Sequence, residues 1–187
     1  METDQVRNLL RQFQAGYTQR DQTRLDEFME LFVAGDELEV IGTNAVEEGK
    51  EEWCLGRAAT RELVSSDWEH WGDVRFNVEG AHITVRGDVA WLATTGTVTD
   101  TITAQDRCTG YLQYVEQVLK EQKRSAQART LDIVGLGADI VLGLPLSETF
   151  VWPFRFTAVA VREAGRWRFQ QMQFSFATTR APDVRWS

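Results

Sequence analysis

Hydrophobic side chains recur with helical spacing at the start of the chain. Over residues 4–19 they stand at positions i, i+3, i+4, i+7 and i+11, which are Val6, Leu9, Leu10, Phe13 and Tyr17. This spacing predicts an amphipathic helix with one buried face. Similar stripes run through residues 22–33 and 57–71. We therefore expect three helices in the first 71 residues, with a short strand at 38–43 between the second and the third.

From Val74 onward the hydrophobic period changes to alternation, which favours strands with one buried face. A break at Glu79-Gly80 indicates a bulge or kink, and Gly87-Asp88 indicates a turn. The turn at 163–166 joins the last two predicted strands. Strands are predicted at 74–78, 81–85, 89–103, 149–162 and 167–178.

The last predicted strand is hydrophobic on both faces. In strict alternation Trp167 and Phe169 fall on one face, and Met172, Phe174 and Phe176 fall on the other. A sheet that is hydrophobic on both sides needs two covers. The N-terminal helices supply one cover, and a second copy of the chain is the natural candidate for the other. We therefore predict a homodimer formed through the outer face of the sheet.

Residues 104–148 interrupt the strands with a predicted helical insertion. Hydrophobic residues have helical spacing around residues 111–119, and an apolar stretch from Leu131 to Leu146 follows. That stretch is too short to span a membrane and carries Asp132 and Asp139. The insertion is interpreted as a packed structural element, a mobile lid or dimer-swapped arm, or a peripheral membrane contact.

Composition restricts the class of protein. A chain of 187 residues with 43% hydrophobic and 26% charged residues fits one domain over residues 1–187. Its net charge of −8, with scattered Lys and Arg, argues against nucleic-acid binding. Cys54 and Cys108 belong to no Cys/His cluster, so we expect no structural metal. Free thiols and an acidic, polar start without a signal peptide favour a cytoplasmic location.

Three groups of short motifs, in this order along the chain, resemble the SnoaL-like branch of the nuclear-transport-factor-2-like superfamily. They are a strand, loop and helix start, a hairpin with a Gly-Asp turn, and a final strand. The motifs lie at residues 40–43 with 52–53 and 56–59, at residues 85–91, and at residues 165–169 with 173–175.

This resemblance implies an α+β fold in which a curved antiparallel sheet forms a cone around the N-terminal helices. It also implies a pocket in the mouth of the cone and a dimer through the outer sheet face. We expect no metal or dissociable cofactor. Members of the superfamily include ketosteroid isomerase, polyketide cyclases, scytalone dehydratase and limonene epoxide hydrolase, beside non-catalytic transport and association domains. Asn44 and Gln173 stand where many relatives have titratable residues, which lowers the expectation of acid–base chemistry at those two positions.

Asp67 and Glu52 are the candidate catalytic residues. Asp67 falls within the apolar stripe of the third helix, and Glu52 lies beside Trp53 in the preceding loop. Burial disfavours the charged form of a carboxyl group and raises its pKa toward neutrality, where it can act as a base. Either residue could instead be a solvated or ion-paired acid.

Aromatic and polar side chains of the predicted third helix, the strands and the loop after the first strand are the candidate ligand-binding residues. Aromatic walls with a few hydroxyl and amide groups are typical of a site for a small hydrophobic or amphipathic molecule. The alternatives are a small isomerase, cyclase, dehydratase or hydrolase, and a non-catalytic association module. The candidate ligand-binding residues are Thr43, Asn44, Trp53, Trp68, Trp91, Thr95, Arg155, Gln171, Gln173 and Ser175.

Overall fold

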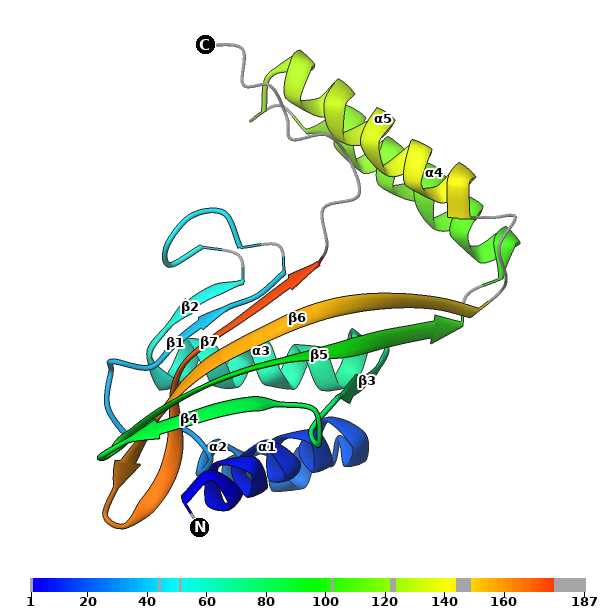
Figure 1. Ribbon diagram of the computed structural model, residues 1–187. Helices are drawn as coiled ribbons and strands as arrows, with labels where there is room; N and C mark the ends of the chain where they lie inside the picture. Colours follow the sequence, from blue (N-terminus) through cyan, green and yellow to red (C-terminus); the bar gives the residue numbers. More distant parts are fainter. Residues whose placement is uncertain are drawn as a thin grey trace. The chain divides into compact units, whose positions relative to one another are not determined.

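The computed structural model describes residues 2–43, 45–50, 52–101, 103–121, 124–143 and 149–176. Its contacts divide the chain into two compact units (Figure 1). The first unit comprises residues 1–98 together with the chain from residue 152 onward, and the second comprises residues 99–151.

The first unit begins with the predicted helices. Helix α1 spans Glu2–Gln19, and all of its predicted stripe residues are buried. A 3₁₀ turn, η1 (Gln22–Arg24), leads into α2 (Leu25–Met29), and α3 spans Gly56–His70. Thr60, Val64 and Trp68 form the buried face of α3. The three predicted helices are therefore confirmed.

The second helix is shorter than the hydrophobic stripe predicts, because residues beyond it pair with a strand. The amide of Val33 donates to the carbonyl of Phe169 at 2.9 Å, and the amide of Phe169 donates to the carbonyl of Leu31 at 2.8 Å. These bonds form an isolated parallel bridge between Phe32 and Phe169. The stripe residue Phe32 is therefore buried, but in a bridge rather than in a helix.

The strands form one curved sheet with the helices on one of its faces (Figure 1). The order is β2-β1-β7-β6-β5-β3, and β4 also pairs with β5. The sheet is mixed, because β1 runs parallel to β7 while β1–β2, β4–β5 and β6–β7 are antiparallel. The strands are β1 (Glu39–Ile41), β2 (Trp53–Leu55), β3 (Asp73–Phe76), β4 (His82–Arg86), β5 (Val89–Thr101), β6 (Thr149–Glu163) and β7 (Arg166–Phe176).

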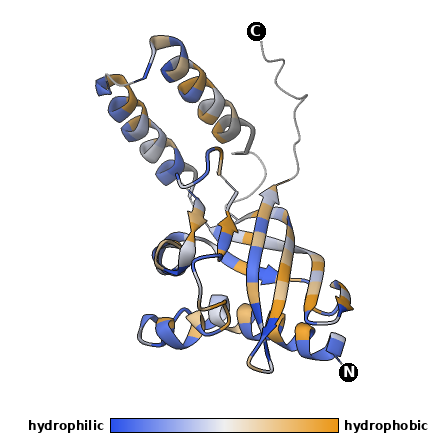
Figure 2. Cartoon of the chain, turned by 90° about the vertical axis from the view of Figure 1, so that its left-hand side faces the viewer, coloured by the Kyte–Doolittle hydropathy of each residue, from blue (hydrophilic) through white to orange (hydrophobic). Residues whose placement is uncertain are grey.

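The α+β fold with a curved sheet around N-terminal helices is thus confirmed, and its strands follow the predicted alternation. Figure 2 shows hydrophobic and hydrophilic residues alternating along the strands. The expectation of an all-antiparallel sheet is corrected at β1, which pairs parallel to β7 from Glu39 opposite Gln171 to Ile41 opposite Gln173.

A β-bulge in β7 changes the expected orientation of its side chains. Val159 pairs with Gln171, whereas its neighbour Ala160 pairs with Phe169, so Gln170 is an extra residue in the ladder. An extra residue shifts the alternation by one position. Trp167, Phe169, Met172 and Phe174 are consequently all buried, with Trp167 7% and Phe174 6% exposed. The inference that β7 is hydrophobic on both faces is therefore wrong.

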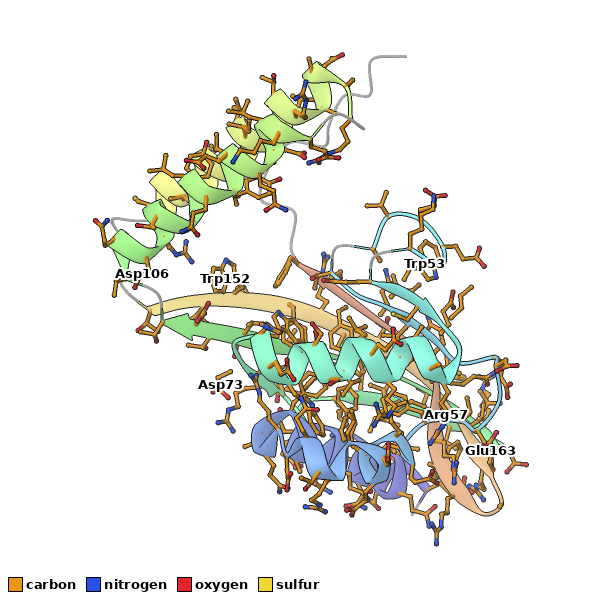
Figure 3. All side chains as sticks on the ribbon, turned by 180° about the vertical axis from the view of Figure 1, so that it is seen from behind. Trp53, Arg57, Asp73, Asp106, Trp152 and Glu163 are labelled. Carbon is orange, nitrogen blue, oxygen red and sulfur yellow. The ribbon has the colours of Figure 1, made fainter. Side chains whose placement is uncertain are left out.

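Aromatic rings fill the space between the helices and the sheet, where side chains crowd in Figure 3. Phe13 of α1 lies at the centre, 1% exposed. Its ring centroid lies 5.4 Å from those of Phe28, Phe76 and Phe169. Tilted and edge-on rings at such distances are favourable aromatic pairs. Much of the chain's aromatic content thus forms a dense core.

The second unit is a pair of helices, α4 (Ala104–Lys120) and α5 (Ala126–Gly143), as the helical spacing predicts. The Thr103 hydroxyl caps α4 by accepting from the amide of Asp106 at 3.0 Å. The Tyr111 hydroxyl donates to the carbonyl of Ile133 at 2.8 Å and so joins α4 to α5. Across the part of the chain that the structure describes, no helix is both long and apolar enough to cross a membrane.

Candidate functional site

A cavity of about 170 Å³ lies inside the first unit, between helices α1 and α3 and strand β7. At about 30 Å³ for each water molecule, it has room for about six waters or one compact organic molecule. This volume is below the roughly 300–1,000 Å³ of drug-sized sites. The lining residues are Phe13, Tyr17, Phe32, Val40, Gly42, Thr43, Glu52, Thr60, Leu63, Val64, Asp67, Trp71, Met172, Phe174 and Phe176.

A tyrosine–aspartate pair is the central polar feature of this cavity. The hydroxyl of Tyr17, in the last turn of α1, donates to Oδ2 of Asp67 at 2.7 Å. Asp67 lies in the last turn of α3, where its carbonyl accepts from the amide of Trp71 at 2.9 Å. Two helix ends therefore bring together side chains that are 50 positions apart in the sequence.

Burial raises the pKa of Asp67 from its ordinary 3.8 to about 6. Removal of water disfavours the carboxylate, and the nearby charge of Glu52 adds to the effect. The hydrogen bond from Tyr17 and the positive charge of Arg20 act in the opposite direction. A carboxyl group with this pKa changes protonation near neutral pH, so it can both accept and donate a proton.

Tyr17 is suited to remain a hydrogen-bond donor. Its ring is 2% exposed. Burial and then the negative charge of Asp67 raise the pKa of Tyr17 well above its ordinary value. The phenol therefore stays protonated across the physiological pH range.

Glu52 is the second carboxyl group that lines the cavity. The Thr43 hydroxyl donates to its Oε2 at 3.3 Å. Gly42 leaves room for this side chain, because a Cβ atom at position 42 would lie 2.4 Å from Oε2 and 2.6 Å from Cβ of Glu52. The Gly-Thr pair that follows β1 thus positions Glu52 at the cavity wall.

Arg20 holds together the two helix ends that carry the tyrosine–aspartate pair. Its guanidinium donates to the carbonyl of Tyr17 at 3.0 Å and to the carbonyls of Trp71 and Gly72. Carbonyls at helix ends lack partners within their own helices. Arg20 thus binds a carbonyl in the last turn of α1 and two carbonyls just after α3, and so ties together the helix ends that carry Tyr17 and Asp67.

We predict that replacing Tyr17 with phenylalanine moves the pKa of Asp67 above about 6. The Tyr17 hydrogen bond stabilises the carboxylate, so its loss favours the protonated form. Carboxyl-carbon NMR titration of aspartate-labelled protein measures the shift. Tyr111→Phe is the matched control, because it removes a hydroxyl that donates to a backbone carbonyl in the second unit. An Asp67 titration curve unchanged by Tyr17→Phe would show that the hydrogen bond does not set this pKa.

Three of the sequence-predicted site residues line the cavity, namely Thr43, Glu52 and Asp67. Asn44 lies outside the described residues. Trp53 lies on the edge strand β2 (Figure 3). Its indole N–H donates to Glu39 at 2.9 Å. Trp68 is buried, with its ring centroid 5.0 Å from that of Phe28, and it lines a separate surface groove. Neither tryptophan is part of the cavity wall.

The remaining candidates belong to sheet positions that do not line the cavity. Gln171, Gln173 and Ser175 alternate along β7 with the cavity residues Met172, Phe174 and Phe176, so they face the other way. The inward face of the sheet is its hydrophobic face. Trp91 and Thr95 of β5 and Arg155 of β6 are exposed and likewise lie outside the cavity wall.

Sequence reasoning assigned Tyr17 to the hydrophobic core and missed its role beside Asp67. A signal was present, because a tyrosine in an otherwise apolar helical stripe needs a partner for its buried hydroxyl. Trp71 and Phe174, which also line the cavity, carry no comparable signal. Their position depends on how the end of α3 packs on β7.

A larger surface groove, about 750 Å³ in volume, lies along α1, α2 and the β6–β7 turn. Two of its exposed carboxylates form ion pairs, Glu27 with Arg24 at 2.8 Å and Glu30 with Arg57 at 3.0 Å. Exposed ion pairs of this kind are common on protein surfaces. The smaller cavity is the better candidate for chemistry, since it contains a partly buried carboxyl group with a raised pKa.

This chain is similar to known proteins in both sequence and fold. A family model described as a SnoaL-like domain matches residues 6–120, which is more than half of the chain. The chain belongs to the SnoaL-like domain family. No curated protein matches its sequence significantly. Among the described residues of this SnoaL-like protein, no group of three His, Cys, Asp or Glu side chains is arranged to hold a metal ion.

Solved structures share the fold of this SnoaL-like protein at low sequence identity. An NTF2-like superfamily protein from Salmonella enterica serovar Typhimurium LT2 aligns at 12% identity with a TM-score of 0.57, covering 97% of this chain and 95% of its own. A candidate dehydratase of the NTF2-like family from Streptomyces avermitilis aligns at 12% identity and a TM-score of 0.56, covering 94% and 96%. A candidate kinase association domain from Thiobacillus denitrificans aligns at 16% identity and a TM-score of 0.52, covering 90% and 92%. Such likeness shows the fold alone.

Proposed function

We propose that this SnoaL-like protein binds one compact, largely hydrophobic molecule in its cavity and transfers a proton to and from a carbon atom of it. The observation that carries this proposal is Asp67, a carboxyl group that lines an aromatic cavity, accepts a hydrogen bond from Tyr17 at 2.7 Å and has a pKa of about 6. Isomerisation and dehydration are the reaction types that such a group supports.

In the proposed reaction, ionised Asp67 removes a proton from a carbon next to a carbonyl group. The electrons of the broken C–H bond form a carbon–carbon double bond and place negative charge on the carbonyl oxygen. In a substrate with a neighbouring carbon–carbon double bond, protonated Asp67 then returns the proton to the far carbon of that bond, and the carbonyl group re-forms. In a substrate with a hydroxyl group on the next carbon, the carbonyl group re-forms as that C–O bond breaks, and the hydroxyl takes the proton and leaves as water. Tyr17 remains a donor throughout, since burial keeps the pKa of its phenol high.

The cavity volume supports a small substrate. About 170 Å³ accommodates a single ring better than the multi-ring compounds that occupy larger sites. The aromatic and aliphatic walls favour an apolar skeleton, while Asp67, Glu52 and Thr43 offer a polar contact region. The fold likeness to a candidate dehydratase is compatible with this proposal and does not establish it.

A binding protein without catalysis is the second candidate. The small cavity favours it, because little space remains for a substrate that must reorient during a reaction. The two candidates share the ligand and differ only in whether Asp67 exchanges a proton with carbon.

Hydrogen–deuterium exchange at carbon tests the proposal directly. Cyclohexanone and 4-aminocyclohexanone are incubated with the protein in D₂O, and proton NMR follows the loss of signal beside the carbonyl group. We expect the wild type to accelerate exchange of at least one ketone, and Asp67→Asn to abolish the acceleration. Equal rates with wild type, Asp67→Asn and no protein would contradict catalysis and favour the binding protein.

The homodimer through the outer sheet face stays a proposal. The hydrophobic outer face that first suggested it is absent from β7, because the bulge at Gln170 places Trp167, Phe169, Met172 and Phe174 on the buried side. Val89 and Trp91 of β5 support it now, being 42% and 44% exposed. Sedimentation velocity at micromolar concentration is expected to give a dimer that Trp91→Glu converts to a monomer. A monomeric wild type would remove the proposal.

A further inference from the structure

The charged groups of the cavity are all of one sign. Among its described lining residues, Asp67 and Glu52 are carboxyl groups, and none is Lys, Arg or His. Arg20 is the nearby cation, but its guanidinium is bound to the carbonyls of Tyr17, Trp71 and Gly72. A ligand inside the cavity therefore meets negative charge without a cationic side chain in the wall.

Aromatic rings make up much of the remaining wall. The rings that line the cavity are those of Phe13, Tyr17, Phe32, Trp71, Phe174 and Phe176. The face of an aromatic ring carries partial negative charge and attracts cations, most strongly where water is excluded. Carboxyl groups and aromatic rings in one small cavity thus favour the same kind of ligand.

We infer that the cavity selects a small organic cation, an amine carried on a single ring or a short branched chain. This inference rests on the proposed function, because it takes the same cavity as the substrate site and names the class of molecule that enters it. An ammonium group would place a positive charge beside the carboxyl groups of Asp67 and Glu52. The hydrocarbon part would lie against the phenylalanine rings.

The same arrangement selects against anions. A carboxylate ligand would add a third negative charge to a wall that contains two carboxyl groups, and like charges in a poorly hydrated space repel strongly. A neutral alcohol of equal shape would keep the hydrophobic contacts and lose the charge interaction. The expected order of affinity is therefore amine, then alcohol, then carboxylate.

Amine binding should strengthen as the pH rises through about 6. The groups that face Asp67 are Tyr17 from α1, Arg20 after α1, Glu52 before β2 and the thiol of Cys54 on β2. The Tyr17 phenol and the Cys54 thiol have raised pKa values and stay neutral in this range. An alkyl amine stays protonated, as lysine does with a pKa of roughly 10. Ionisation of Asp67 is thus the change that strengthens binding.

Isothermal titration calorimetry with benzylamine, benzyl alcohol and benzoate tests the inference. At pH 7.5 we expect benzylamine to bind at least tenfold more tightly than benzyl alcohol, with benzoate weakest. Asp67→Asn and Glu52→Gln should each weaken benzylamine binding at least fivefold and leave benzyl alcohol within twofold. The alcohol binding serves as the check that each variant retains a folded cavity.

Several results would overturn the inference. These are benzyl alcohol or benzoate binding as tightly as benzylamine, benzylamine affinity unchanged in both variants, and no binding of any probe. Failure of the proposed function looks different, because amine binding without deuterium exchange would leave the inference standing and remove catalysis. Equally fast exchange of cyclohexanone and 4-aminocyclohexanone would support catalysis and remove the inferred preference for amines.

Discussion

Replacement of Asp67 by asparagine is expected to stabilise the protein at neutral pH while abolishing its proposed activity. The pKa of Asp67 is about 6 in the folded chain, against an ordinary value of 3.8. Because the folded chain binds the Asp67 proton more tightly than the unfolded chain does, protonation stabilises the fold. This contribution is fully present below pH 3.8 and is lost as the pH rises through about 6. Above that range the fold contains an ionised, largely buried carboxylate that an asparagine would not introduce.

A pKa shift of about two units corresponds to roughly 3 kcal/mol at most. Because Asp67 is not fully buried, we expect Asp67→Asn to raise the free energy of unfolding by about 1–2 kcal/mol at pH 7.5. At pH 4 the gain should nearly vanish. The asparagine carbonyl still accepts from Tyr17, so the variant keeps the local hydrogen bond. Urea unfolding at the two pH values measures both numbers.

Asp26→Asn is the matched control for stability. The Asp26 side chain is 85% exposed and forms a surface ion pair with Arg61 at 2.9 Å. Its replacement should change the free energy of unfolding by less than about 0.5 kcal/mol, with little dependence on pH. A loss of stability in Asp67→Asn that is the same at pH 4 and pH 7.5 would show that Asp67 has no raised pKa in the fold.

The activity of Asp67→Asn should fall by about 10²–10⁴-fold, the usual contribution of a positioned general acid or base. An amide cannot accept a proton from carbon at any accessible pH. The wild-type rate of deuterium incorporation should rise as the pH increases through about 6, because the ionised carboxylate is the reactive form. A rate without a change near this pH would assign the proton transfer to another group.

Replacement of Phe13 by alanine is expected to be the most destabilising single change in the core. The ring is 1% exposed and lies between α1, α2 and the sheet. Besides Phe28, Phe76 and Phe169, its centroid lies 5.0 Å from that of Tyr17 and 5.9 Å from that of Phe156. Loss of a buried phenylalanine ring leaves a cavity and costs about 3–5 kcal/mol.

Thermal and urea unfolding of Phe13→Ala measure this loss, with Phe176→Ala as the control. Phe176 ends β7 and is 37% exposed, so the same substitution removes less buried surface there. We expect less than half of the Phe13→Ala effect. Equal losses of unfolding free energy in the two variants would show that the ring contacts of Phe13 stabilise the fold no more than the partly exposed ring of Phe176 does.

Much of the fold could be predicted from local patterns. The stripe from Val6 to Tyr17 determined which face of α1 is buried, and the alternation of β3, β4 and β5 indicated strands. Helical spacing in the insertion indicated α4 and α5. These predictions hold because burial of an apolar stripe depends on the period of one element and on no distant residue.

The candidate site could be predicted only in part. Asp67 and Glu52 were identifiable as acids beside aromatic residues, and they do line the cavity. Gln173 and Ser175 were expected beside them because the polar face of β7 was assumed to be concave. The concave face is the hydrophobic one, since the helices that cover it leave no water for polar groups.

The sequence by itself determined the α+β class, the helices, the strands and the acid within the apolar stripe of α3, because each follows from local periodicity. Tertiary structure alone decided the parallel pairing of β1 with β7 and the bulge at Gln170, which turns Phe169 and Met172 to the same side. It also decided that Tyr17 meets Asp67. These features depend on contacts between distant segments, where one extra residue in a ladder reverses the side on which every later side chain lies.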